Sequence, residues 1–151
     1  MVKIKILIDA DGCPVVKKVI EISRIYSIKC IIVCDSCHIF KTDYAEIITV
    51  DKGADSADFK IANLAVQGDI VVTQDYGLAA MCLAKKAEAV NQDGMIYTED
   101  NIDALLLSRH TAKKIRKGGG RLKGPPPRTA AQDRKFAEIF AEMVRNKCKS
   151  E

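Results

Sequence analysis

Aspartates follow two of the apolar segments that the sequence predicts to be strands. The run Lys3–Ile8 leads into Asp9 and Asp11, and the run Asp69–Thr73 leads into Asp75. In an open parallel α/β sheet, ligands bind in the crevice at the carboxyl ends of the strands. We therefore expect Asp9, Asp11 and Asp75 to line one crevice.

A second pair of aspartates stands at the start of a predicted helix. Asp55 and Asp58 are three positions apart, so they share one face of that helix. The same pair also suits capping, with Asp55 as N-cap and Asp58 near the positive end of the helix dipole. Asp75 has the same alternative, as the cap of the next helix. Each residue alone is explained as a cap, whereas the whole set favours a shared site.

Carboxylates that converge need something to offset their repulsion. Two of them about 4 Å apart repel by roughly 4 kcal/mol at an effective dielectric near 20, and a bound cation or protonation removes that cost. Mg²⁺ or Mn²⁺ prefers oxygen ligands, and such an ion can polarise a phosphodiester and activate water. Thr73 either orients that water or is a buried hydroxyl bonded to the backbone. The predicted metal ligands are Asp9, Asp11, Asp58 and Asp75. The predicted catalytic residues are Asp9, Asp55, Asp58, Asp75 and Thr73.

Charge is distributed unevenly along the chain. Residues 1–107 have a net charge of −5 and residues 108–151 a net charge of +9. This asymmetry predicts an acidic site and a basic docking surface for the phosphate backbone of RNA, the alternative being a solvated helix face. The predicted RNA-binding residues are Arg109, Lys113, Arg116, Lys117, Arg121, Lys123 and Arg128.

Aromatic residues that could stack on bases are few. The chain is 5% aromatic and has no Trp. Tyr44, Tyr76 and Tyr97 are the candidates for base stacking, with simple packing as the alternative for each.

Strand-like and helix-like segments alternate over the first two thirds of the chain. The expected strands are Lys3–Asp9, Lys29–Cys34, Ile47–Val50, Asp69–Thr73 and Ala87–Asn91. The expected helices are Pro14–Tyr26, Asp55–Gln67, Tyr76–Lys86 and Ile102–Lys117, the last with Asn101 as its N-cap. The buried face of Asp55–Gln67 is expected to comprise Phe59, Ala62, Ala65 and Val66. Repeated βα units predict an α/β fold, a doubly wound and mostly parallel sheet flanked by helices. A length of 151 residues predicts a single domain.

The C-terminal third has a different character. Residues 118–128 are rich in Gly, Pro and basic residues, which predicts a flexible loop. Residues 129–149 are predicted to be a helix, and Thr129 and Gln132 have the spacing of a capping box. Its apolar stripe packs either on the domain or on a second copy in a homodimer. The stripe comprises Phe136, Ile139, Phe140, Met143 and Val144.

Neither a membrane span nor an export signal is evident in the sequence. Apolar runs stay well short of the roughly 18 residues of a span, so we expect a cytoplasmic protein with no membrane partner. Cys34, Cys37 and His38 formally match a haem-attachment or partial zinc pattern. Because no second cluster supplies further ligands, we interpret this match as chance.

Four motifs in order resemble the bacterial YaiI/YqxD family of uncharacterised proteins. They are Ile8–Val15, Gly53–Asp58, Gly68–Ala79 and Gly124–Thr129, and the closing amphipathic helix matches as well. That family is similar to PIN-like nucleases, which bind Mg²⁺ or Mn²⁺ through clustered acidic residues and cut RNA. The resemblance implies one PIN-like domain over residues 1–151.

The resemblance also implies roles for individual aspartates. Asp9 would be the first-strand metal ligand, Asp55 or Asp58 the helix-borne carboxylate, and Asp75 the ligand after the fourth strand. Asp11 matches the family motif but receives no PIN-like role. A metal-dependent RNA nuclease is therefore the leading hypothesis.

Two other functions remain open from the sequence. In a haloacid-dehalogenase-like phosphatase, Asp9 would be the nucleophile and Asp11 the acid and base. A helix beginning at Pro14 leaves little room for the flap of that group, whose lysine is not clearly placed. In a non-catalytic RNA-binding module, residues 109–128 would bind RNA and the aspartates would be structural.

Overall fold

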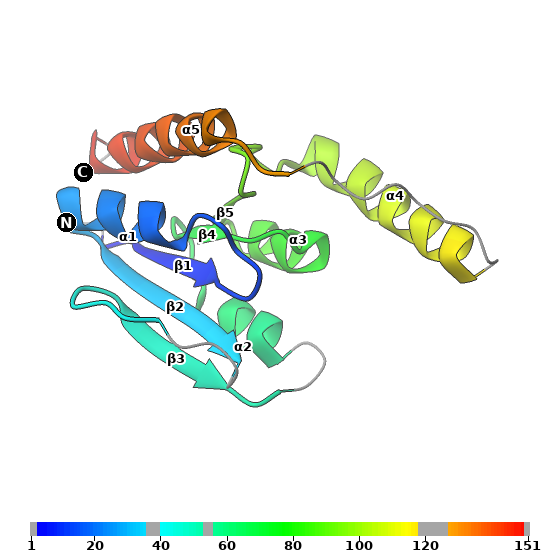
Figure 1. Cartoon of the computed structure of the whole chain (residues 1–151), viewed down its shortest axis with the longest axis horizontal. Helices are drawn as coiled ribbons and strands as arrows, with labels where there is room; N and C mark the ends of the chain where they lie inside the picture. Colours follow the sequence, from blue (N-terminus) through cyan, green and yellow to red (C-terminus); the bar gives the residue numbers. More distant parts are fainter. Residues whose placement is uncertain (1–2, 36–39, 53–55, 118–126, 150–151) are drawn as a thin grey trace.

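A parallel sheet forms the centre of this computed structural model, which describes residues 3–35, 40–52, 56–117 and 127–149. The strands are β1 (Lys5–Asp9), β2 (Lys29–Asp35), β3 (Glu46–Val50), β4 (Ile70–Val72) and β5 (Glu88–Val90). The helices are α1 (Val16–Ile25), α2 (Ser56–Leu64), α3 (Tyr76–Ala84), α4 (Glu99–Lys117) and α5 (Ala130–Lys149). These five strands pair in parallel, in the order β3-β2-β1-β4-β5 (Figure 1). The predicted α/β class and doubly wound sheet are confirmed.

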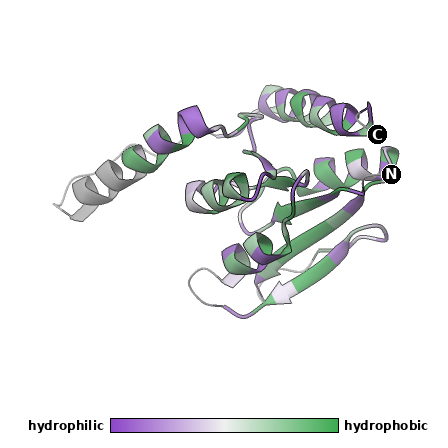
Figure 2. Cartoon of the chain, turned by 180° about the vertical axis from the view of Figure 1, so that it is seen from behind, coloured by the Kyte–Doolittle hydropathy of each residue, from purple (hydrophilic) through white to green (hydrophobic). Residues whose placement is uncertain are grey.

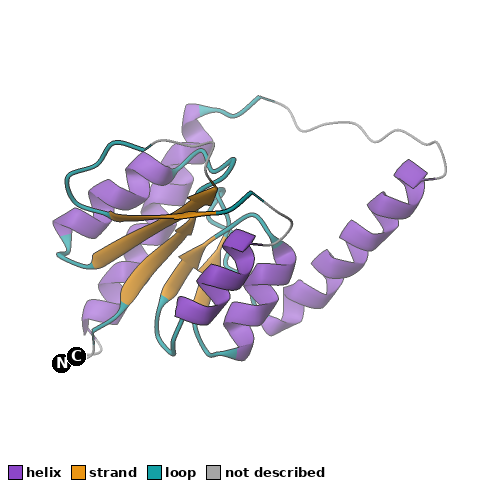
Figure 3. Cartoon of the chain, turned by 90° about the horizontal axis from the view of Figure 1, so that it is seen from below, coloured by secondary structure: helices purple, strands orange, loops and turns teal. Residues whose placement is uncertain are grey.

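Helices cover both faces of the sheet, which explains the uninterrupted apolar strands (Figure 3). In β1, Ile6 and Ile8 pack in the cluster beneath α1 and α5, and Leu7 packs in the cluster beneath α2 and α3. All three side chains are fully buried. Strands buried on both faces carry continuous apolar runs, as Ile6–Ile8 in β1 and Ile70–Val72 in β4 do.

The apolar stripe of α5 packs on its own chain. Phe136 and Phe140 are fully buried in the cluster that also contains α1, and their rings stack with centroids 5.4 Å apart. The capping box also forms, since Thr129 N–H donates to Gln132 Oε1 and Gln132 N–H donates to Thr129 Oγ1. Figure 2 shows hydrophobic residues on the strands and on the helices that face them.

The first half of helix α4 packs against the body of the protein. Ile102 is buried, and Leu105 and Leu106 are partly buried in a cluster with α3. Beyond this contact, α4 extends away from the body on the side to which the strand arrowheads point (Figure 1). The basic half of α4, residues 109–117, therefore projects from the carboxyl side of the sheet.

The cap of α4 differs from the prediction. The helix begins at Glu99, and Asn101 lies inside its first turn. Thr98 takes the capping position: Asn101 N–H donates to Thr98 Oγ1 (3.1 Å), and Thr98 N–H donates to Asn101 Oδ1 (2.9 Å). The prediction that Asn101 is the N-cap was wrong because Asn101 completes a capping box that begins three residues earlier.

The buried face of α2 also differs from the one we expected. Phe59 and Val66 were expected to face the core but are 59% and 52% exposed. Ala65, which was expected to face the core as well, is buried, and so is Ile61, which was not. The apolar residues of this short segment fit two helical phases, so periodicity alone could not choose between them.

Across the described ranges, no helix is both long enough and apolar enough to cross a membrane.

Candidate functional site

The pairing of β1 with β4 brings Asp9 and Thr73 to the same level of the sheet. Ile8 lies opposite Val72, and the residues that directly follow them, Asp9 and Thr73, begin the site. The buried Thr73 hydroxyl donates to Asp9 Oδ2 (2.8 Å) and accepts from Asp75 N–H (2.9 Å). Thr73 therefore links the two aspartates that the sequence placed at neighbouring strand ends.

Asp75 has a second, structural task. Its carboxylate accepts from Leu78 N–H (3.0 Å), which makes it the N-cap of α3. One oxygen serves the helix in this way, and the side chain also lines the site. The capping role anticipated for Asp75 is confirmed, and it fixes the direction of the carboxylate.

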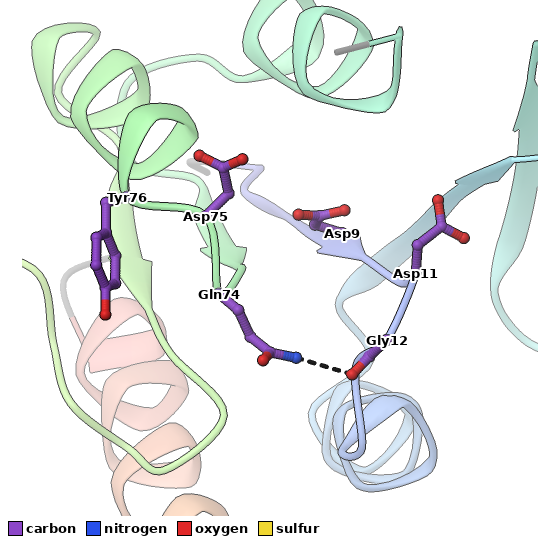
Figure 4. Close-up of a pocket in the computed structure, with 6 residues that line it drawn as sticks. All are labelled: Asp9, Asp11, Gly12, Gln74, Asp75 and Tyr76. Atoms are coloured by element: carbon purple, nitrogen blue, oxygen red, sulfur yellow. Dashed lines mark hydrogen bonds between the residues drawn. The ribbon is translucent and has the colours of Figure 1, made fainter. Parts of the chain in front are cut away.

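Two adjoining hollows lie at the carboxyl edge of the sheet. The first has a volume of about 400 Å³ and is lined by Asp9, Asp11, Gly12, Gln74, Asp75 and Tyr76 (Figure 4). The second has a volume of about 240 Å³ and shares three of these aspartates. Its other lining residues are Asp35, Val50, Asp51, Ser56, Ala57 and Asp58. The structure thus brings together every described aspartate predicted for the site.

Negative charge converges on Asp9. Burial raises the pKa of the Asp9 carboxyl from 3.8 to about 6, and the charges of Asp75 and Asp11 act in the same direction. The hydrogen bond from Thr73 partly opposes that rise. A carboxyl in this position carries an electrostatic cost at neutral pH, which a cation nearby would relieve.

Asp11 and Gln74 fix the turn after β1. The Asp11 carboxylate accepts from Asp35 N–H (3.1 and 3.3 Å), which ties the turn to the end of β2. Gly12 has φ +75°, a conformation that glycine adopts readily. The Gln74 amide donates to Gly12 O (2.8 Å) and joins the turn to the β4–α3 connection. The walls of the first hollow are therefore held from both sides.

The donor set suits a hard divalent cation that keeps much of its water. Among the described lining residues of the two hollows, every side chain that carries a formal charge is an aspartate. Among the described residues, no group of three or more His, Cys, Asp and Glu side chains is arranged to hold a metal ion directly. Mg²⁺ commonly binds through one or two carboxylates plus water and substrate phosphate, a mode that needs no closed cage. The residues present fit that mode.

Several predicted residues lie at or beyond the limits of the described structure. Asp55, Arg121 and Lys123 lie outside the described residues, as do Cys37 and His38 and most of the predicted loop 118–128. Arg109, Lys113, Arg116 and Lys117 all lie on the projecting half of α4. The first three follow an i, i+4, i+7 spacing, which places them on one helical face.

Arg128 makes a structural clamp, whereas the sequence suggested a phosphate contact. Its Nε donates to Asp133 (2.6 Å), and its two terminal nitrogens donate to Asp93 (2.7 Å) and to the carbonyl of Gln92 (2.6 Å). All three guanidinium nitrogens are engaged in this way. Arg128 therefore fastens the start of α5 to the loop after β5.

Sequence reasoning missed parts of the site that the same rule could have found. Asp35 ends β2 and Asp51 follows β3, so both stand at carboxyl ends of strands. Gln74 was not considered at all, and Tyr76 was named only for stacking. Of the other two tyrosines, Tyr97 is 2% exposed and the Tyr44 hydroxyl donates to Ile28 O, so both serve packing.

Comparison with known proteins assigns the chain to a family. The sequence profile described as "Uncharacterized BCR, YaiI/YqxD family" matches residues 7–146. The chain belongs to this family. Relatives in the family include the UPF0178 protein of Exiguobacterium sibiricum, 49% identical over 95% of this chain and 98% of its own. The UPF0178 protein of Alkaliphilus oremlandii is 50% identical over 93% of this chain and 90% of its own.

One solved structure shows a distant likeness. It is the crystal structure of Rae1 (YacP) from Bacillus subtilis, in its W164L mutant form. The two chains are 14% identical with a TM-score of 0.47, and the match covers 98% of this chain and 99% of Rae1. A likeness at this level says nothing about activity.

Proposed function

We propose that this protein is a Mg²⁺- or Mn²⁺-dependent nuclease that hydrolyses phosphodiester bonds of RNA. The observation that carries the proposal is the position of Asp9 and Asp75. They follow adjacent strands, are linked through Thr73 and line one open hollow. A substrate phosphate can enter such a hollow, whereas a purely structural carboxylate pair would be enclosed and paired.

In this proposal Asp9 and Asp75 hold the cation, with Asp11 and Asp58 at the edges of its water shell. Once bound, the cation would polarise the phosphodiester and lower the pKa of a bound water. Thr73 keeps one Asp9 oxygen oriented, and the capping bond to Leu78 orients Asp75. Because the pKa of Asp9 is about 6 without metal, we expect cation binding to weaken as the pH falls below 6.

The basic half of α4 would bind the RNA backbone. Arg109, Lys113 and Arg116 share one face of a helix that projects from the carboxyl side of the sheet (Figure 1). Backbone contacts of this kind give affinity that is independent of sequence and sensitive to salt. Arg128 is not part of this surface in the proposal, because its guanidinium is used within the fold.

Two observations favour a nuclease over a haloacid-dehalogenase-like phosphatase. The Asp11 carboxylate accepts from the backbone of Asp35, which does not suit a general acid and base that must reach a substrate oxygen. Neither hollow has a Lys or Arg among its described lining residues to bind a phosphate monoester.

The test is cleavage of a broad panel of RNA and DNA by purified protein with Mn²⁺. Asp75→Asn should lower the rate by more than about 100-fold, since it removes a ligand charge. Asparagine still caps a helix, so α3 should stay intact. The matched control is Asp43→Asn, which removes an equal charge at an exposed ion pair with Arg24 and should cleave normally.

Failure to cleave any substrate would contradict the nuclease proposal. If RNA still bound in that case, and bound equally well to Asp75→Asn, the protein would be a non-catalytic RNA-binding module. A covalent phosphate trapped on Asp9 would instead favour the phosphatase.

A further inference from the structure

The first hollow has two chemically different sides. Asp9, Asp11 and Asp75 form one side, and the view in Figure 4 shows their carboxylates pointing away from the other. The opposite side consists of Gly12, the Gln74 amide and the Tyr76 ring, none of which carries a formal charge. The second hollow, which continues from the acidic side, is lined by six further described residues, all of them uncharged or acidic and none of them aromatic. An aromatic surface is thus found only at one end of the combined site, among its described lining residues.

The Tyr76 ring is held in place before any ligand arrives. Tyr76 is the first residue of α3 and directly follows the capping Asp75. Its ring meets the ring of Tyr97 edge to face, with centroids 6.1 Å apart and an interplanar angle of 64°. Tyr97 is buried and donates its hydroxyl to the carbonyl of Thr73 (3.1 Å). The ring support is therefore connected to the same residue that orients Asp9.

A ring fixed beside a phosphate site fits a flat, uncharged group that is covalently attached to a phosphate. A nucleobase has this shape, and every base can stack on an aromatic ring whatever its sequence. A base inside a duplex is already stacked and paired, so only an unpaired base is available without an unstacking cost. The lack of charge on Gln74 and Tyr76 also disfavours a second phosphate at this end.

We propose that Tyr76 is the stacking platform of a nucleobase subsite, which receives the unpaired base next to the phosphate bound at Asp9 and Asp75. The proposal rests on the proposed function and adds its substrate class, single-stranded rather than duplex nucleic acid. Gln74 would lie between the bound base and the turn at Gly12, because its amide donates to Gly12 O. Tyr97 is a positioning residue that holds the Tyr76 ring.

The test is a binding cycle with short single-stranded oligonucleotides whose 2′-O-methyl groups resist cleavage. Fluorescence anisotropy compares an intact oligonucleotide with versions that carry one abasic site at each position in turn. For wild type, we expect one position at which loss of the base weakens binding about ten-fold. Tyr76→Ala should bind the intact oligonucleotide about ten-fold more weakly and show no further loss at that position. Tyr76→Phe should behave as wild type, since it keeps the ring.

Two further variants keep the result interpretable. Tyr76→Leu retains apolar packing against Tyr97 and removes the aromatic face, so it replaces Tyr76→Ala if that variant does not fold. The control Tyr26→Ala removes a tyrosine at the end of α1, whose hydroxyl accepts a hydrogen bond from Arg145. This variant should bind the abasic oligonucleotides with the same loss of affinity as wild type.

The outcomes separate this subsite from the nuclease activity. An abasic penalty that is equal in wild type and Tyr76→Leu would overturn the subsite, even if the protein cleaves RNA. A penalty that disappears in Tyr76→Leu but remains in Tyr76→Phe would support the subsite, even if no cleavage is found. Equal binding of duplex and single-stranded oligonucleotides would also overturn it.

Discussion

Two aspartates at opposite ends of the sheet show how differently this fold treats a carboxylate next to a strand. Asp69 lies just before β4 and is fully buried, with Lys5 Nζ at 2.6 Å and backbone N–H groups of Lys5 and Val66 at 3.0 and 2.9 Å. Asp9 ends β1 and receives one hydroxyl hydrogen bond, while Asp75 and Asp11 add negative charge nearby. At the amino end of the sheet, Lys5 neutralises the Asp69 carboxylate. At the carboxyl end, further carboxylates lie near Asp9 and add negative charge.

The difference indicates what each end is for. A buried charge with an ion pair and backbone donors is stable without any ligand, and it fixes the start of β1 against β4. A partly buried charge among like charges costs stability and is retained where a ligand later offsets that cost. The contrast between Asp69 and Asp9 is therefore one between a structural carboxylate and a binding carboxylate.

The largest effect on stability should come from Asp69→Asn. This variant leaves the part-buried Lys5 ammonium without its counter-charge and presents an amide N–H₂ to existing donors. We expect a loss of about 3 kcal/mol in the free energy of unfolding, measured by urea denaturation. Glu21→Gln, which breaks an exposed pair with Lys18, should leave the free energy of unfolding nearly unchanged. A loss below about 1 kcal/mol for Asp69→Asn would contradict the contrast drawn between Asp69 and Asp9.

Asp9→Asn should instead increase the free energy of unfolding. The pKa of Asp9 is about 6 in the folded protein against 3.8 ordinarily, so the folded state binds more protons between these values. The free energy of unfolding must then fall as the pH rises from about 4 through 6. At pH 7.5 and without metal, Asp9→Asn should be more stable than wild type by about 1–3 kcal/mol.

The pH dependence of that gain checks its cause. Near pH 3, where the Asp9 carboxyl is largely protonated in both states, the gain of Asp9→Asn should nearly vanish. Asp43→Asn, whose carboxyl pairs with Arg24 at the surface, should show no gain at any pH. A destabilised Asp9→Asn at pH 7.5 would mean that the chain itself neutralises Asp9.

A smaller effect is expected for Thr73→Val, which sharpens the comparison from within the site. Valine keeps the volume but removes the donor to Asp9 and the acceptor of Asp75 N–H. Stability should fall by about 1–2 kcal/mol, and NMR titration should show the pKa of Asp9 raised further. Thr73→Ser retains the hydroxyl and should titrate as wild type. An unchanged Asp9 titration in Thr73→Val would contradict the link.

The order of strands and helices was predictable from the sequence because the central strands β1, β2 and β4 contain buried apolar runs. Ile70–Val72 has no polar interruption, and the glycines and aspartates around it mark its ends. The same pattern placed Asp9 and Asp75 at strand ends, and parallel topology then brought them together. The local sequence was enough to predict these positions because its preferences agree with the tertiary fold.

The remaining features depend on contacts between distant segments. Nothing near Arg128 in sequence indicates Asp93 as its partner, since the two are 35 residues apart. The bond from Gln74 to Gly12 spans 62 residues. The exposure of Phe59 likewise depends on which side of α2 meets the sheet. Spacing rules describe one element at a time and cannot supply these pairings.

The most direct measurement is calorimetric titration of Mn²⁺ into wild type and the Asp9→Asn/Asp75→Asn double variant at pH 7.5. A control double variant, Asp43→Asn/Asp103→Asn, removes the same charge from exposed positions. We predict saturable binding to wild type and to the control, and none to the variant that lacks Asp9 and Asp75. Equal binding to all three proteins, or to none of them, would contradict a cation site at the carboxyl ends of β1 and β4.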